Sequence, residues 1–165
     1  MKYSPDVHHR HSIRLKNYDY SQAGAYFITL CIQNRECVLG EIIDRNMHLS
    51  PVGENVFLQW RNLPQRFSGL ELDVFVVMPN HFHAIISINS VGQGAASSAP
   101  TVGKILRAFK SISAVEGNRL LKRSSQPFWQ RNYWEHVIRN EKELMTLRQY
   151  ILSNPAQWEL DSLYM

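Results

Sequence analysis

The hydrophobic positions of the chain follow two periods, and their order predicts alternating strands and helices. Stretches rich in β-branched and aromatic residues, or nearly continuous in apolar ones, predict strands. They are residues 26–33, 38–43, 47–49, 74–78, 81–88 and 135–139. The second and third stretches can form a hairpin across Asp44-Arg45-Asn46, because short polar residues favour tight turns.

Three other segments have apolar residues at helical spacing. The first follows Ser50-Pro51, a plausible N-cap and first helical residue, and is expected to end near residues 67–69. The second carries one apolar face made by Val102, Ile105, Leu106, Phe109 and Ile112. The third is expected over about residues 141–153, where Asn140 can cap the helix and Glu143 can complete a capping box.

This order of elements predicts an α+β fold. We expect a ferredoxin-like, mostly antiparallel sheet with the helices packed on one face. The length of 165 residues suits a single domain over residues 1–165. Within it, residues 1–20 form a basic N-terminal segment, and the Gly-, Ala- and Ser-rich residues 89–101 form a flexible loop.

Composition narrows the functional classes. A net charge of +4 favours polyanionic partners such as nucleic acid without requiring one. Cys31 and Cys37 have the spacing of neither a zinc knuckle nor a redox motif, so buried thiols are the simpler interpretation. No apolar run is long enough for a transmembrane helix, and the N-terminus has no apolar signal-peptide core, so we expect a cytoplasmic protein.

The most informative chemical pattern is His81-Phe82-His83, at the start of a predicted strand. Residues two apart in a strand project from the same face, so both imidazoles would point the same way. Neutral imidazole is a common ligand of divalent metals. The motif alone also fits two partly buried histidines bonded to the backbone, and both interpretations stay open at this point.

A second group lies on the last predicted helix, where Tyr150 and Asn154 share one edge one turn apart. If this edge faces the histidines, the Asn154 carbonyl can bind the same metal while the Tyr150 phenol points at the bound group. A metal can withdraw charge from a phosphodiester, and a tyrosine can attack it as a nucleophile. A tyrosine at the core edge and an asparagine ending a helix are the alternative interpretation.

The segment from Val77 to His83 resembles the HUH motif (histidine, bulky apolar residue, histidine) of single-tyrosine endonucleases. Residues 150–155 (YILSNP) are similar to the Tyr-Ile-x-x-Asn-Pro block of REP-associated tyrosine transposases. Further blocks are similar to the family in the family order: residues 10–15, 19–20, 24–27 and 128–140. The resemblance covers most of the chain, and the ordered combination is far more specific than His-x-His alone.

The resemblance implies an enzyme that cleaves and rejoins single-stranded DNA at hairpin-forming repeats. By position, His81, His83 and Asn154 would hold Mg²⁺ or Mn²⁺. Tyr150 would be the nucleophile, forming a 5′-phosphotyrosine and leaving a free 3′ hydroxyl. The family setting implies a bacterial, nucleoid-associated protein, and a homodimer remains open.

Other residues are weaker candidates. Six cationic side chains are expected to contact DNA phosphates, although a solvated surface explains them equally well. They are Arg10, Arg14, Lys16, Lys104, Arg107 and Lys110. His136 is a candidate second-shell group or general base, although a structural strand histidine is the simpler interpretation.

Three functions therefore compete. The first is a metal-dependent tyrosine transposase. The second is a hairpin DNA-binding protein without catalysis, and the third is a phosphodiesterase that uses water and does not need Tyr150.

Overall fold

The computed structural model describes residues 24–89 and 100–164. Their strands and helices follow the predicted order: β1 (Gly24–Cys31), β2 (Gly40–Ile43), β3 (Asn46–Leu49), α1 (Pro51–Arg61), β4 (Leu70–Val77), β5 (His81–Ile88), α2 (Val102–Leu120), β6 (Trp134–Ile138) and α3 (Glu141–Ser153). Short 3₁₀ helices are η1 (Gln33–Arg35), η2 (Leu63–Gln65) and η3 (Pro155–Leu160).

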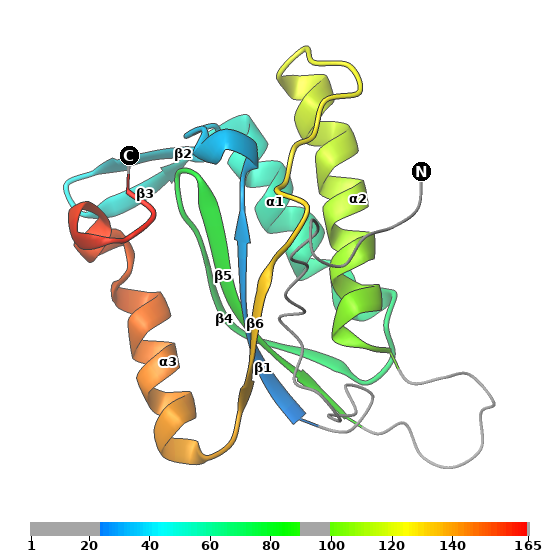
Figure 1. Ribbon diagram of the computed structural model, residues 1–165, viewed down its shortest axis with the longest axis vertical. Helices are drawn as coiled ribbons and strands as arrows, with labels where there is room; N and C mark the ends of the chain where they lie inside the picture. Colours follow the sequence, from blue (N-terminus) through cyan, green and yellow to red (C-terminus); the bar gives the residue numbers. More distant parts are fainter. Residues whose placement is uncertain (1–23, 90–99, 165) are drawn as a thin grey trace, which may run out of the picture.

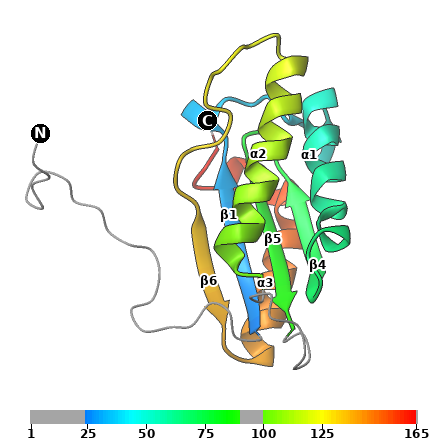
Figure 2. The same ribbon diagram turned by 90° about the vertical axis from the view of Figure 1, so that its right-hand side faces the viewer.

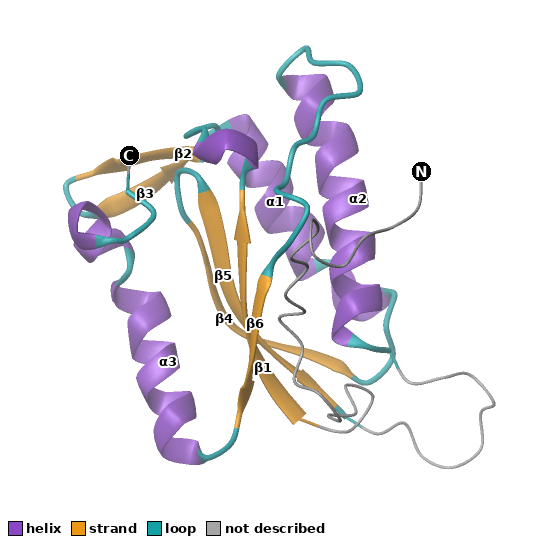
Figure 3. Cartoon of the chain, viewed as in Figure 1, coloured by secondary structure: helices purple, strands orange, loops and turns teal. Residues whose placement is uncertain are grey.

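The main sheet has four antiparallel strands in the order β4-β5-β1-β6 (Figure 3). This is the strand order of the predicted ferredoxin-like architecture, so the α+β prediction is confirmed. Strand β5 lies between β4 and β1, and its first residues are paired on the β1 side, where His81 faces Cys31 and His83 faces Thr29. The two histidines therefore belong to a central strand.

The helices cover both faces of the sheet (Figures 1 and 2). Helices α1 and α2 pack on one face around a large core that includes Trp60, Phe82 and Phe109. Helix α3 packs on the other face, where Ile151 joins a smaller cluster with Phe27 and Ile85. The expectation that the helices pack on one face is therefore wrong for α3. Alternate residues of β1 and β5 give each face its own apolar surface.

Strands β2 and β3 form a separate two-stranded hairpin, as the sequence predicts. Its turn residues Asp44 and Arg45 have φ angles of 49° and 65°, the pair of positive values that a type I′ hairpin turn requires. This turn brings the hairpin next to the C-terminal segment, drawn in red beside it in Figure 1.

Helix α1 begins as predicted but ends earlier. The Ser50 side chain accepts a hydrogen bond from the backbone N–H of Gly53, at 3.1 Å. The helix ends at Arg61 rather than near residues 67–69, and a 3₁₀ turn follows. Pro64 explains the early end, because a proline disfavours α-helical geometry at the preceding residue.

Helix α3 has the predicted bounds, and Asn140 Oδ1 accepts a hydrogen bond from the Glu143 backbone N–H. The Glu143 carboxylate accepts from the backbone N–H of Arg139 instead of from that of Asn140, so the capping box is displaced by one residue. Arg148 forms a forked ion pair with Asp73, at 2.6 Å and 3.0 Å, which ties the helix to β4. These contacts fix the helix that carries Tyr150.

The described ranges contain no helix long and apolar enough to cross a bilayer. The predicted basic segment, residues 1–20, lies outside the described residues, as does most of the predicted loop at residues 89–101.

Candidate metal and tyrosine site

His81 and His83 lie on the same face of β5, facing α3. Both side chains are buried, and their ring centroids are 4.6 Å apart. A tight turn at Pro79-Asn80 starts the strand, and the Met78 N–H donates to the His81 carbonyl at 2.8 Å. The predicted orientation of the two imidazoles is therefore present.

Each imidazole is held through its Nδ1 atom. His81 Nδ1 lies 2.8 Å from Asn80 Oδ1, and Asn80 Nδ2 donates to the Leu163 carbonyl, which turns Oδ1 toward the ring. His83 Nδ1 lies 2.8 Å from Thr29 Oγ1. Because an amide oxygen can only accept, His81 carries its proton on Nδ1 and presents a free Nε2 lone pair. Partners of this kind orient metal-binding histidines.

Burial keeps both imidazoles neutral near pH 7. It lowers the pKa of His81 to about 4, an effect that the nearby Asp161 carboxylate partly offsets. Burial also lowers the pKa of His83 to about 3, with a further lowering by the neighbouring His81. Neutral imidazole is the form that binds metals.

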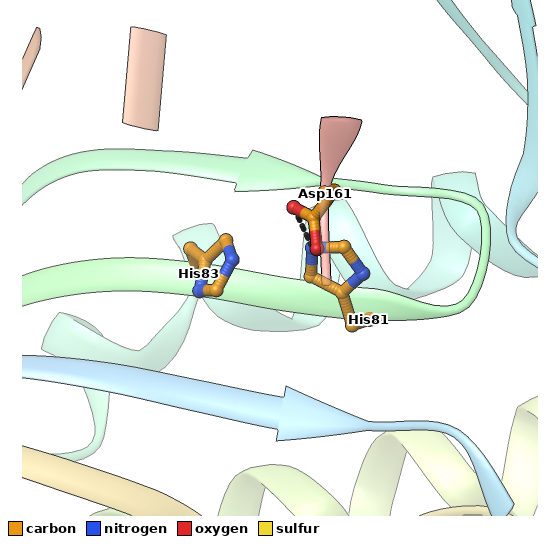
Figure 4. Close-up of side chains that lie close together, drawn as sticks. All are labelled: His81, His83 and Asp161. Carbon is orange, nitrogen blue, oxygen red and sulfur yellow. Dashed lines mark ion pairs between the residues drawn. The ribbon is translucent and has the colours of Figure 1, made fainter. Parts of the chain in front are cut away.

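Asp161 joins the two histidines, although the sequence patterns gave no sign of it. One of its carboxylate oxygens lies 3.7 Å from His81 Nε2, and its side chain is 3% exposed (Figure 4). One ligand atom from each of His81, His83 and Asp161 lies within 4.8 Å of the other two. Asp161 follows η3, beyond the last periodic helix, so no helical spacing links it to Tyr150.

Asn154 lies beside this group at the end of α3. It is buried, and its Nδ2 donates to Asp161 Oδ2 at 3.2 Å. Among the described residues, neither Asn154 Oδ1 nor His81 Nε2 has a hydrogen-bond partner. Buried polar atoms without a partner are costly, and a bound cation could satisfy both of these.

The donor set fits a divalent metal. Two neutral imidazoles and a carboxylate are suitable ligands for several divalent ions, and the Asn154 oxygen lies close by. Asn154 as a direct ligand stays a prediction, as does the choice between Mg²⁺ and Mn²⁺.

Tyr150 reaches the same group from α3 of the same chain. Its hydroxyl lies 3.3 Å from His83 Nε2, and its ring packs edge-on against His83 and Phe27. The side chain is 40% exposed, so it is also open to solvent. Burial, followed by the negative charge of Asp161, raises the pKa of the phenol. The phenol is therefore protonated in the protein alone.

The chain is related to known proteins over most of its length. It is 40% identical to an uncharacterized Haemophilus influenzae protein, covering 99% of this chain and 98% of the relative. A second Haemophilus influenzae protein, named "Putative REP-associated tyrosine transposase", is 24% identical over 87% of this chain and 77% of its own length. No protein-family model matches the chain.

Two solved structures share the fold. A REP-associated tyrosine transposase bound to a REP hairpin superposes with a TM-score of 0.61, at 19% identity, over 87% of this chain and 73% of the other. A "putative transposase" from Deinococcus radiodurans gives 0.51, at 19% identity, over 84% and 95%. The chain belongs to one family with the first Haemophilus protein, and it resembles the REP-associated tyrosine transposases.

In this transposase-like fold, three of the predicted DNA-binding residues lie on α2, across the sheet from Tyr150. Lys104, Arg107 and Lys110 line a hollow of about 630 Å³ together with Arg131. Lys110 Nζ donates to the carbonyls of Gln130 and Arg131, so it also holds the segment before β6. Among the residues that the structure describes, none that lines this hollow is acidic. The other three candidates, Arg10, Arg14 and Lys16, lie outside the described residues.

His136 lies on β6, on the face that α3 covers. Its Nε2 lies 2.6 Å from a Glu143 oxygen in the first turn of α3. Glu143 precedes Tyr150 by seven residues, which is roughly 10 Å along a helix. His136 is therefore engaged at the opposite end of α3 from the candidate metal-binding group, and its predicted role as a base or second-shell group stays a prediction.

Proposed function

We propose that this protein is a metal-dependent transposase that cleaves and rejoins single-stranded DNA at hairpin-forming repeats through a covalent phosphotyrosine. The observation that carries the proposal is the Tyr150 hydroxyl 3.3 Å from His83, beside the buried group of His81, His83 and Asp161. A nucleophile candidate and a metal-binding group thus share one small volume. Both come from a single chain, so one chain can supply the whole site.

The relatives support the class of substrate. One similar structure is described as a REP-associated tyrosine transposase bound to a REP hairpin, and one sequence relative carries the corresponding name. We propose that this chain takes the same kind of DNA, in the bacterial nucleoid.

The chemistry divides cleavage and rejoining into two displacements. The Tyr150 oxygen attacks the phosphorus, the bond from phosphorus to the 3′ oxygen breaks, and that oxygen leaves as a 3′ hydroxyl after taking up a proton. The phenolic proton is released as the new bond forms, leaving the 5′ phosphate on Tyr150. Attack by another 3′ hydroxyl reverses the step and rejoins the strands. A divalent cation held by the histidines and Asp161 would withdraw charge from the phosphodiester.

The cationic hollow on α2 is proposed to hold the sugar–phosphate backbone of the hairpin. Arg107 and Arg131 are exposed there, and the cationic side chains of Lys104 and Lys110 line the same hollow. Cationic side chains bind phosphates by releasing condensed counterions. Because residues 131–133 lead directly into the edge strand β6, DNA in the hollow would reach Tyr150 around that edge. Arg10, Arg14 and Lys16 are proposed to add contacts beside the hairpin.

A covalent trapping experiment tests the proposal. Purified protein is incubated with labelled hairpin DNA and Mn²⁺, and denaturing gels are used to detect a protein–DNA adduct. We expect an adduct with the wild type and none with Tyr150→Phe or with His81→Ala/His83→Ala. Thr146→Val is the control, because it removes a hydroxyl from the same helix that bonds to the Lys142 carbonyl, and it should still form the adduct.

The competing functions give different results. A hairpin-binding protein without catalysis binds the DNA and produces neither adduct nor cleavage. A phosphodiesterase that uses water cleaves without an adduct and tolerates Tyr150→Phe. An adduct that persists in Tyr150→Phe would show that another residue is the nucleophile.

A further inference from the structure

A second hollow is lined in part by Trp158, whose ring lies near that of His81. It measures about 580 Å³ and lies between the β2–β3 turn and the C-terminal segment, which are neighbours in Figure 1. Its lining includes Asp44, Arg45, Trp158, Glu159 and Tyr164. We call it the aromatic hollow. None of these residues has a role in the chemistry proposed above.

Aromatic rings connect this hollow to the catalytic group. The Trp158 ring centroid lies 5.8 Å from that of His81, and the planes are inclined by 33°. Tyr164 meets Trp158 edge-on at 5.1 Å and is 48% exposed. A ligand in the aromatic hollow would therefore contact one side of Trp158 while His81 lies against the same residue.

The charges of the aromatic hollow differ from those of the cationic hollow on α2. Asp44 and Glu159 contribute carboxylates, whereas Arg45 contributes the one guanidinium among the described residues of its lining. Such a balance does not favour a phosphate group. It favours a neutral, planar ligand that has hydrogen-bond donors on its edge, because carboxylates accept hydrogen bonds and aromatic rings offer flat surfaces.

We propose that the aromatic hollow binds one unpaired base of the substrate DNA that carries an exocyclic amino group. This inference rests on the proposed function, which places single-stranded DNA at His81 and Tyr150. Every base can stack on an aromatic ring, but cytosine, adenine and guanine carry an amino group that can donate a hydrogen bond to a carboxylate. The volume also lies within the usual range of small-molecule pockets, roughly 300–1,000 Å³. The bound base belongs to a nucleotide near the scissile phosphate.

A binding experiment on the non-cleaving Tyr150→Phe protein tests the inference. Hairpin DNA with single-stranded flanks is prepared in versions that each lack one flanking base, and the dissociation constants are measured at fixed salt. We expect one flank position whose missing base weakens binding by roughly 5- to 100-fold, the range that stacking of one base gives. Adding Trp158→Ala should remove this dependence, and Trp158→Phe should preserve it.

The amino group is tested separately. Purine in place of adenine at the sensitive position keeps the stacking surface and removes the amine. If the natural base there is not adenine, adenine and purine are compared with each other. DNA that carries purine at this position should bind the Tyr150→Phe protein more weakly than DNA that carries adenine there. When Asp44→Gly and Glu159→Ala are added to this protein, the two DNAs should bind equally. Both substitutions are at exposed positions, and glycine accepts the positive φ of residue 44.

Two results would overturn the inference. Either no flank position is sensitive, or the sensitive position costs as much in Trp158→Ala as in the parent protein. Failure of the proposed function would instead appear in the covalent trapping experiment, where the wild type would form no adduct. A wild-type adduct together with a flank that is insensitive to Trp158 would reject the aromatic hollow alone.

Discussion

At the residue scale, the site depends on how two imidazoles are oriented. Asn80 and Thr29 bond to the Nδ1 atoms of His81 and His83, which leaves both Nε2 atoms directed toward Asp161 and Tyr150. Neither Asn80 nor Thr29 is a candidate ligand. Both are expected to act by fixing the tautomer and the ring angle of a ligand.

Thr29→Val should weaken metal binding. Valine keeps the shape of threonine but removes the hydroxyl that bonds to His83. We expect the affinity for Mn²⁺, measured by titration calorimetry, to fall by about 10- to 100-fold. Thr146→Val is the matched control, since the Thr146 hydroxyl donates to the Lys142 carbonyl of its own helix. Equal affinity in both variants would show that Thr29 does not position His83.

Stability without metal should fall in acid. Because burial lowers the pKa of His81 to about 4 and of His83 to about 3, the folded protein binds fewer protons than the unfolded chain below about pH 6.5. The free energy of unfolding, measured by urea titration in a chelator, should therefore decrease from pH 6.5 to pH 4. His83→Gln should decrease less over this interval. An identical pH dependence in both proteins would contradict the neutral, buried state of His83.

Sequence alone could predict the residues that belong to a repeating pattern. His81 and His83 follow from the strand period, and Tyr150 and Asn154 follow from the helix period. Asp161 could not be predicted, because the non-periodic segment η3, which ends at the preceding residue, leads the chain to His81. Such a contact depends on tertiary structure and produces no repeating pattern in the local sequence.

At the scale of elements, capping and turn signals predicted boundaries well. The Asn140 cap fixed the start of α3, and the two-residue turn at Asp44-Arg45 fixed the hairpin. The end of α1 does not follow from periodicity, because the apolar spacing continues to Leu63 although Pro64 disfavours α-helical geometry at that residue. The sequence also does not predict which face of the main sheet α3 covers. The choice depends on which side of the sheet the chain crosses after β6, and amphipathicity does not specify this.

Helix α3 should be sensitive to loss of its cap. Asn140→Ala removes the oxygen that accepts from the Glu143 N–H, and we expect a loss of about 1 kcal/mol in the free energy of unfolding. Lys142→Ala, at an exposed position in the first turn, should change it by less than about half of that. Chemical denaturation measures both. Equal effects would mean that the cap does not stabilise the helix that carries Tyr150.

At the scale of the whole molecule, the sheet separates two surfaces. Helices α1 and α2 cover one face, and α2 carries the cationic hollow, whereas α3 covers the other face, where His81, His83 and Asp161 lie (Figure 2). If the proposed function holds, this arrangement would allow DNA binding and DNA cleavage to be changed separately by substitution.

Loss of cationic side chains from the hollow should weaken DNA binding without abolishing the covalent adduct with Tyr150. With Arg107→Gln and Arg131→Gln, hairpin affinity should fall, and the slope of log affinity against log salt should become shallower by roughly 2 for two lost phosphate contacts. Arg119→Gln is the control, because Arg119 is paired with Glu116. An unchanged slope would show that the hollow does not contact phosphates.

The most direct measurement is the identity of the residue that becomes linked to DNA. Wild-type protein is trapped with its hairpin substrate and Mn²⁺ and digested with protease and nuclease, and the modified peptide is sequenced by mass spectrometry. The account predicts a nucleotide phosphate on Tyr150, the residue whose hydroxyl lies 3.3 Å from His83. Phosphate linked to any other residue, or cleaved DNA that carries no peptide, would contradict it.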